Sequence, residues 1–423
     1  MNTGKTILCC SAALLIAASA IPSLSQEVEL TPKEELGKAI FFDPNLSINQ
    51  NQACAACHGP EAGWTGPEAA TNAGGAVYEG SIPGRFGNRK PPSAAYATTS
   101  PIFYLQEHPS LNFVGGNFWD GRATGYKLGN PAADQAQFPF LNPLEQGLPD
   151  SACVVYQVCH AAYPVSYSFT DVWGAEVCDI AWPVDTATQC SSEGTTVGLS
   201  DADRAKSNMA YDYIALSIAA YEGSPEVNAF SSKYDYSFKG MAKLSIEERR
   251  GFALFMGKGG CNRCHSAVGK DALFTDYTYD NLGIPKNTAN PFYAAHPDFI
   301  DYGLGGYLES LGYPEEVYEP EMGKQKVPTL RNVDKRPEPG FVKAYGHNGY
   351  FKSLEEIVHF YNTRDVLPTC SDVAVPQEGV NCWPEPEVPE NVNTDELGDL
   401  GLSEAEEADI VAFLKTLSDD FTE

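Results

Sequence analysis

Positively charged residues are scarce in this chain of 423 residues. Lys and Arg total 28 against 56 Asp and Glu, which gives a formal net charge of −28 at pH 7. Such an acidic excess argues against binding to nucleic acid or to anionic lipid, because like charges repel. It favours a positively charged partner, although solubility alone also accounts for it.

Long apolar runs and long alternating stretches are missing as well. One apolar run, Ile7–Ile21, is short for a membrane span, and no later segment resembles one. No alternation with a period of two residues is long enough to predict a substantial sheet. Together with 38 Gly, 30 Pro and 22 Tyr, these absences predict a mainly α protein with long ordered loops that does not span a membrane.

The N-terminus has the pattern of a secretory signal. Lys5 supplies its positive end, the apolar run follows, and Ser23-Leu24-Ser25 matches a cleavage site of small residues. Residues 1–25 are therefore predicted to be a signal peptide. Cys9 and Cys10 stand at the start of the apolar run, not at its end, which argues against a lipoprotein anchor.

Two copies of Cys-x-x-Cys-His carry the strongest chemical signal. They read Cys54-Ala55-Ala56-Cys57-His58 and Cys261-Asn262-Arg263-Cys264-His265. This spacing is the attachment pattern of a c-type haem, in which the two thiols bind the haem vinyl groups and the histidine ligates the iron. The chain is therefore predicted to carry two covalently bound haem c groups, with an electron path between them.

Two other interpretations of Cys-x-x-Cys fit less well. A zinc knuckle needs a second Cys/His pair at ligand spacing, and neither motif has one nearby. A thioredoxin-like redox pair does not require the following histidine, which both copies have.

The remaining cysteines predict disulfides. Of the 12 cysteines, two lie in the predicted signal and four in the motifs, so an even set of six is left for an oxidising compartment. Cys370–Cys382 is the simplest pair. Cys153, Cys159, Cys178 and Cys190 allow three connectivities, and they mark segment 151–200 as a disulfide-stapled insertion.

Capping residues and apolar periodicity predict several helices. They cover 31–40, 201–221 and 353–361, and two more begin at Ser245 and Ser403; residues 59–118 are predicted to be loop. The length suits two domains. We place their boundary near 235, giving helical, cytochrome c-like domains at 26–235 and 236–423 with one haem each.

Several further blocks resemble the bacterial di-haem cytochrome c peroxidases and MauG-type enzymes. They are Asn117-Phe118-Trp119-Asp120-Gly121-Arg122-Ala123, Asp134-Gln135-Ala136, Asn142-Pro143-Leu144-Glu145 and Val327-Pro328-Thr329-Leu330-Arg331-Asn332-Val333. Both haem motifs and these blocks occur in the family order. The resemblance covers nearly the whole mature chain except the insertion.

The resemblance implies a role for particular residues. His58 would ligate the N-terminal, peroxide-reacting haem and His265 the C-terminal, electron-transfer haem. Trp119 would pass electrons between the haems; the plainer interpretation is a core tryptophan. Three more residues match the family's distal pocket, where peroxide binds and loses a proton: Gln135, Glu145 and, at the MauG position, Pro139.

The second axial positions of the two irons favour the MauG type. Many peroxidases cap the N-terminal iron with a histidine on the loop after the motif, yet residues 59–107 contain none. The C-terminal iron usually has a methionine fourteen residues after a family histidine. Counted from His347, that place holds Tyr361, as in MauG-type enzymes, and tyrosinate is a known haem ligand; otherwise Tyr361 is an ordinary helix-face aromatic.

Calcium between the domains is common in the family, but its ligand regions are altered here. Asn88-Arg89-Lys90-Pro91-Pro92 stands where an Arg-Asn-x-Pro run is usual, and Val342-Lys343-Ala344 stands where Thr and Pro are usual. Backbone carbonyls are also calcium ligands, so calcium stays an open expectation.

The resemblance implies a periplasmic peroxidase that takes electrons for hydrogen peroxide from a small redox protein, a cytochrome c or a cupredoxin. One alternative is MauG-like oxidation of aromatic side chains in a partner protein during its maturation. Another is a di-haem electron carrier without catalysis. The resemblance also allows a homodimer.

Overall fold

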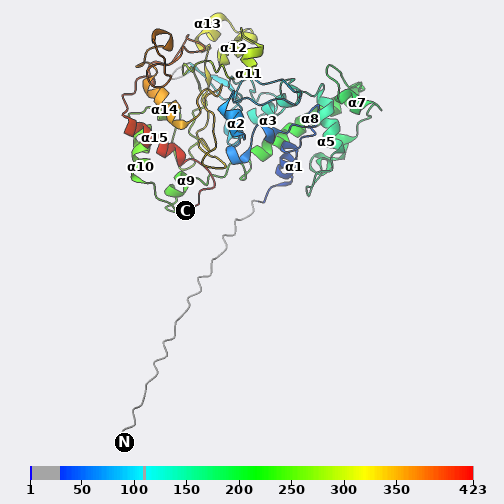
Figure 1. The fold of residues 1–423 in the computed structure, drawn as a ribbon. Helices are drawn as coiled ribbons and strands as arrows, with labels where there is room; N and C mark the ends of the chain where they lie inside the picture. The colour runs from blue at the N-terminus through cyan, green and yellow to red at the C-terminus, as the bar shows by residue number, and fades with distance from the viewer. Residues whose placement is uncertain (2–28, 108–110, 423) are drawn as a thin grey trace.

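The computed structural model describes Met1, residues 29–107 and residues 111–422. The predicted signal peptide lies outside the described residues except for Met1. Helices and loops make up most of the molecule, and its few strands are short (Figure 1). The prediction of a mainly α protein is confirmed. Within the described ranges, no helix is both long and apolar enough to cross a membrane.

The elements have the following bounds. The α-helices are α1 Pro32–Phe41, α2 Ala69–Ala73, α3 Pro131–Ala136, α4 Phe138–Leu141, α5 Ser151–His160, α6 Phe169–Trp173, α7 Thr186–Cys190, α8 Asp201–Glu222, α9 Lys233–Phe238, α10 Ile246–Met256, α11 Pro291–Ala295, α12 Gly303–Ser310, α13 Glu315–Tyr318, α14 Leu354–Thr363 and α15 Glu404–Lys415. The 3₁₀ helices are η1 Cys54–Ala56, η2 Pro60–Ala62, η3 Ala97–Thr99, η4 Ala175–Cys178, η5 Cys261–Arg263, η6 Glu319–Glu321 and η7 Cys370–Asp372.

The described strands form two small antiparallel sheets. Strands β1 (Tyr104–Gln106) and β2 (Asn112–Val114) pair with Leu105 opposite Phe113. Strands β3 (Tyr279–Asp280) and β4 (Gln325–Lys326) pair with Tyr279 opposite Lys326. Phe113 of β2 and Tyr279 of β3 are buried in one small hydrophobic cluster with Phe103, Leu304 and Leu308.

The helices predicted from caps are confirmed, and their caps explain where they begin. Thr31, Ser245 and Ser403 each accept a hydrogen bond from the backbone three residues on, and a glutamate there closes a capping box. Ser200 and Ser353 cap α8 and α14 in the same way, without the reciprocal bond. The predicted loop at 59–118 is largely irregular but contains α2, two 3₁₀ turns and the β1–β2 hairpin.

Each half of the molecule packs the helix before its Cys-x-x-Cys-His motif against a later helix. Helix α1 crosses α8, and α10 crosses α15; the pairs stand at opposite sides of the molecule in Figure 1. A glycine permits each crossing. A Cβ on Gly37 would lie 1.9 Å from the Ser217 carbonyl oxygen, and one on Gly251 would lie 1.8 Å from that of Asp409. Two similar helix pairs therefore carry the two motifs, although the sequence shows no repeat beyond the motifs.

Two hydrophobic clusters fill the halves. The first contains buried residues from Leu36 to Val227, and the second contains buried residues from Tyr234 to Leu417. Arg331 lies near the junction, fully buried among four aromatic rings, and donates to Asp235 at 2.7 Å and to the Ala272 carbonyl at 2.7 Å. The domain boundary at 235 stays a prediction.

The three predicted disulfides are present. Cys370 pairs with Cys382, and the insertion is held by Cys153–Cys190 and Cys159–Cys178. The insertion packs α5 against α8, and its two disulfides link segments within the insertion itself.

The Cys153–Cys190 link should contribute measurably to stability. It closes a 37-residue separation, and the chain-entropy model assigns such a loop about 3–4 kcal/mol. We expect Cys153→Ala/Cys190→Ala to lower the free energy of unfolding in guanidinium by about that amount. A Ser192→Ala variant, exposed in the same insertion, is the control, and an unchanged midpoint in the double variant would contradict the expectation.

Stability should also fall as the pH rises, because of a buried carboxyl at the end of α8. Glu222 is 4 % exposed, and burial raises its pKa to about 8. The folded state therefore binds this proton more tightly than the unfolded chain, and the stability it adds below the unfolded pKa of 4.5 is lost as the pH rises through about 8. We expect Glu222→Gln to be more stable than the parent by roughly 2–4 kcal/mol at alkaline pH, with the difference vanishing in acid. If the free energies of unfolding of the parent and of Glu222→Gln differ by the same amount at every pH, Glu222 does not cause this pH dependence.

Candidate functional site

The two Cys-x-x-Cys-His motifs have the same local geometry. Each begins with a 3₁₀ turn, η1 or η5. In each motif the backbone N–H of the histidine donates to the backbone carbonyl of the first cysteine, at 3.0 Å for His58 and 2.8 Å for His265. This turn sets both thiols and the imidazole on one side of a short loop. The four motif cysteines carry free thiols, whereas the other described cysteines form disulfides.

Both imidazoles are held in the form that ligates a metal. His58 Nδ1 donates to the Trp64 carbonyl at 3.2 Å, and His265 Nδ1 donates to the Phe274 carbonyl at 2.9 Å. A carbonyl only accepts, so the proton is on Nδ1 and the lone pair is on Nε2. Burial lowers the pKa of His58 to about 4 and also lowers that of His265, which keeps both rings neutral. Free thiols and oriented neutral imidazoles fit covalent haem at both motifs.

One cavity is lined by both motifs. Its wall also contains every other residue that the sequence singled out as a site residue: Trp119, Gln135, Pro139, Glu145 and Tyr361. The structure therefore brings together the whole predicted set, although its members span both halves of the chain. Their individual roles stay predictions.

Trp119 is one of the residues that line this cavity. Its side chain is 8 % exposed, and its indole N–H donates to the Lys90 carbonyl at 2.9 Å. The Lys90 N–H donates in turn to the His347 carbonyl at 2.8 Å, and the rings of Trp119 and His347 meet edge to face with centroids 6.5 Å apart. Trp119 thus contacts segments from both halves.

Three residues line the N-terminal part of the cavity. Gln135 lies on α3, Pro139 on α4, and Glu145 on the loop that follows. Burial raises the pKa of Glu145, while the charge of Arg122 opposes that rise. Because its pKa is raised, this carboxyl gives up its proton less readily than a solvent-exposed glutamate does.

Tyr361 lies on α14 in the C-terminal part of the cavity. Burial raises the pKa of its phenol, and the neighbouring Cys261 and Cys264 add to the rise. The phenol is therefore protonated in the protein without haem. A cation bonded to its oxygen would displace that proton, as metals do with their ligands.

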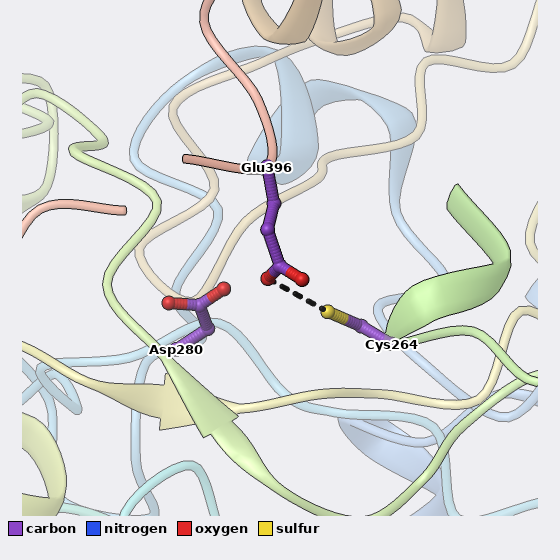
Figure 2. Close-up of side chains that lie close together, drawn as sticks. All are labelled: Cys264, Asp280 and Glu396. Carbon is purple, nitrogen blue, oxygen red and sulfur yellow. Dashed lines mark hydrogen bonds between the residues drawn. The ribbon is translucent and has the colours of Figure 1, made fainter. Parts of the chain in front are cut away.

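A pair of carboxylates beside Cys264 was not anticipated from the sequence. Asp280 and Glu396 lie with the Cys264 sulfur so that the three ligand atoms are within 4.8 Å of one another (Figure 2). Asn393 donates to both carboxylates, at 2.6 and 2.9 Å. Cys264 is predicted to attach haem, and its sulfur would then be a thioether, which is a poor partner for these carboxylates in a metal site. No local pattern marks Asp280 or Glu396, which meet only through the fold.

A buried ion cluster next to Trp119 was also missed. Arg89 donates to Asp120 at 2.6 Å and, with two nitrogens, to Asp301 at 2.6 Å each. Burial acts against the charge of Arg89, but the two carboxylates raise its pKa overall. Asp120 belongs to the Trp-Asp-Gly block, so the cluster fixes the turn that carries Trp119.

Comparison with known proteins agrees with this geometry. The family model for di-haem cytochrome c peroxidase matches residues 31–243. The methylamine utilization protein MauG of Paracoccus denitrificans is 32% identical over 423 residues, covering 97% of this chain and 95% of that protein. The cytochrome-c peroxidase IdrP1 of Denitromonas iodatirespirans is 27% identical, covering 91% of this chain and 81% of that protein.

Solved structures show the same fold. The crystal structure of the diheme peroxidase BthA from Burkholderia thailandensis superposes with a TM-score of 0.68 at 27% identity, over 93% of this chain and 87% of that one. The family model, these relatives and the two motifs that line one cavity agree. The chain therefore belongs to the di-haem cytochrome c peroxidase family, whose members are enzymes with two covalently bound haems.

Proposed function

We propose that this protein is a periplasmic di-haem peroxidase that reduces hydrogen peroxide at the N-terminal haem with electrons delivered through the C-terminal haem. The observation that carries the proposal is the single cavity lined by both motifs, Trp119 and the three residues Gln135, Pro139 and Glu145. The predicted signal peptide, covalent haem attachment and three disulfides support an oxidising compartment. The acidic chain suits a basic electron donor such as a small cytochrome c or cupredoxin.

Bound haem supplies an iron that accepts peroxide oxygen and exchanges electrons. The protein's own residues handle the protons. Peroxide loses a proton from its near oxygen, and its far oxygen must gain one to leave as water. The buried Glu145 carboxyl, with its raised pKa, suits the shuttling of that proton.

Gln135 and Pro139 line the same cavity as Glu145 and differ in their hydrogen-bonding groups. The Gln135 amide can donate one hydrogen bond to peroxide and accept another, which would orient it. Pro139 has no backbone N–H, so its ring closes one side of the pocket without offering a competing donor.

Trp119 is proposed to carry electrons between the two haem pockets. Its indole is buried, donates a hydrogen bond to the Lys90 carbonyl and meets the His347 ring edge to face. Fixed geometry lowers the reorganisation that accompanies electron transfer. Tyr361 is proposed to help hold the C-terminal iron, and a phenolate bonded to that iron would favour the oxidised metal over the reduced one.

MauG-like oxidation of aromatic side chains in a partner protein is the second candidate. Tyr361 in the C-terminal pocket and the absence of histidine from residues 59–107 favour it, as does the similarity to a methylamine utilization protein MauG. The two candidates differ in the electron source, a diffusing redox protein or the side chains of a substrate protein. A non-catalytic electron carrier does not require Gln135, Pro139 and Glu145 in the haem cavity, so this third candidate is less favoured.

Turnover should depend on Glu145. In Glu145→Gln we expect the rate of peroxide-dependent oxidation of reduced cytochrome c by the holoprotein to fall by about 100-fold or more, since general acid–base groups contribute that much. Glu193→Gln is the control, because Glu193 lies in the insertion and pairs with Arg85 on the surface. A Glu145→Gln variant that turns over like the control would remove Glu145 from the mechanism. Absence of donor oxidation by the parent, with partner-protein oxidation intact, would favour the MauG-like candidate.

Ligation by Tyr361 has a spectroscopic test. Tyr361→Met should change the optical and electron paramagnetic resonance spectra of the C-terminal haem and leave those of the N-terminal haem unchanged. Tyr345→Phe is a matched control, because Tyr345 lines the same cavity but its hydroxyl accepts a hydrogen bond from Arg336. Identical spectra for Tyr361→Met and the parent would exclude Tyr361 as a ligand.

A further inference from the structure

A lysine ammonium group occupies a cage of backbone carbonyls between the two halves. Lys343 Nζ donates to the carbonyls of Ala62, Asn332 and Lys335, at 2.8, 2.7 and 3.1 Å. Lys343 is 4 % exposed. Its three protons match three acceptors. Ala62 follows the first haem motif, whereas the other two acceptors belong to the second half, so one ammonium joins both.

A second buried ammonium lies beside the same loop. We call this contact between the two halves the seam; it comprises Ala62, Thr65, Lys90, Asn332, Lys335 and Lys343. Lys90 is 8 % exposed, and its Nζ donates to the Thr65 hydroxyl and the Pro91 carbonyl, both at 2.9 Å. The backbone of Lys90 bonds Trp119 and His347. Burial lowers the pKa of Lys343 well below its usual value and that of Lys90 to about 8, whereas the oxygen atoms that accept their hydrogen bonds favour the charged form of each.

These residues do not fit the calcium ion expected from the family resemblance. Calcium takes six to eight oxygen ligands, but the two segments that depart from the family pattern, 88–92 and 342–344, carry the ammonium groups of Lys90 and Lys343. Three carbonyl oxygens of the seam are already hydrogen-bonded to Lys343. A divalent ion beside two ammonium groups in a dry seam would meet strong repulsion.

We propose that Lys90 and Lys343 supply the positive charge between the two halves of this protein, and that the protein therefore binds no calcium there. The Lys343 ammonium holds the loop after the first haem motif to residues 332–335, and the Lys90 ammonium holds Thr65 of that loop to Pro91. The cation is then part of the chain and is not lost to chelators.

The first test uses the parent holoprotein. After incubation with calcium chloride and gel filtration, elemental analysis should find no stoichiometric calcium. Neither the chelator EGTA nor added calcium should change the melting temperature or the haem spectra. Stoichiometric bound calcium, or a melting temperature and spectra that change with EGTA, would overturn the proposal.

The second test converts the seam back into a metal site. Lys90→Asn/Lys343→Ala frees the carbonyl cage and adds an amide oxygen. Without calcium we expect the melting temperature of this variant to fall by about 5 °C, as orphaned buried carbonyls imply, and added calcium should recover part of the loss.

Lys352→Ala is the matched control for the second test. Lys352 also donates to three carbonyls, those of Asn72, Gly74 and Gly349, but it is half-buried, so water can replace its ammonium. Lys352→Ala should not respond to calcium. If the double variant folds and its melting temperature does not change with calcium either, the seam is no cation site and the proposal is contradicted. If the double variant does not fold, the calcium content of the parent decides.

Discussion

The buried charges between the two halves are the constraint on which the rest of the structure depends. Arg89 holds Asp120 from its own half and Asp301 from the other, with every bond at 2.6 Å. An unpaired buried charge costs several kcal/mol, so neither half can move away from the other without exposing these groups to water. The adjacent Lys90 extends the same loop to Trp119 and His347.

This constraint explains why the cavity is shared. The two helix pairs, α1 with α8 and α10 with α15, each support one haem motif. The loop 88–92 and the Trp119 turn bring the two motifs to one cavity, because they take hydrogen-bond partners from both halves. Rigid placement of Trp119 is what an electron path needs, since transfer depends steeply on geometry. In the same way, Lys343 fixes the loop that follows the first motif.

Local features of the fold could be predicted from the sequence, and long-range ones could not. The capping boxes at Thr31, Ser245 and Ser403 involve residues three apart, so the sequence displays them directly. Cys370–Cys382 spans 12 residues and was the simplest pair, but the pairing within the insertion required the fold.

The same distinction between local and long-range features applies to the residues of the candidate site. The haem motifs are contiguous and were read from their spacing, and Gln135, Pro139, Glu145 and Tyr361 were found only through the family resemblance. Arg89 and Asp301 are separated by 212 residues, and Lys343 and Ala62 by 281. No periodicity or cap links such positions, and a lysine in a loop is ordinarily solvated.

The most direct test of this account is the response of the fully ferric holoprotein to one equivalent of hydrogen peroxide, followed by optical and electron paramagnetic resonance spectroscopy. If the two pockets share oxidising equivalents through Trp119, the signals of both haems change in the same kinetic phase, and Trp119→Phe separates the two changes in time. A change confined to the N-terminal haem, with the C-terminal haem unaffected in the parent, would contradict the coupling of the two sites.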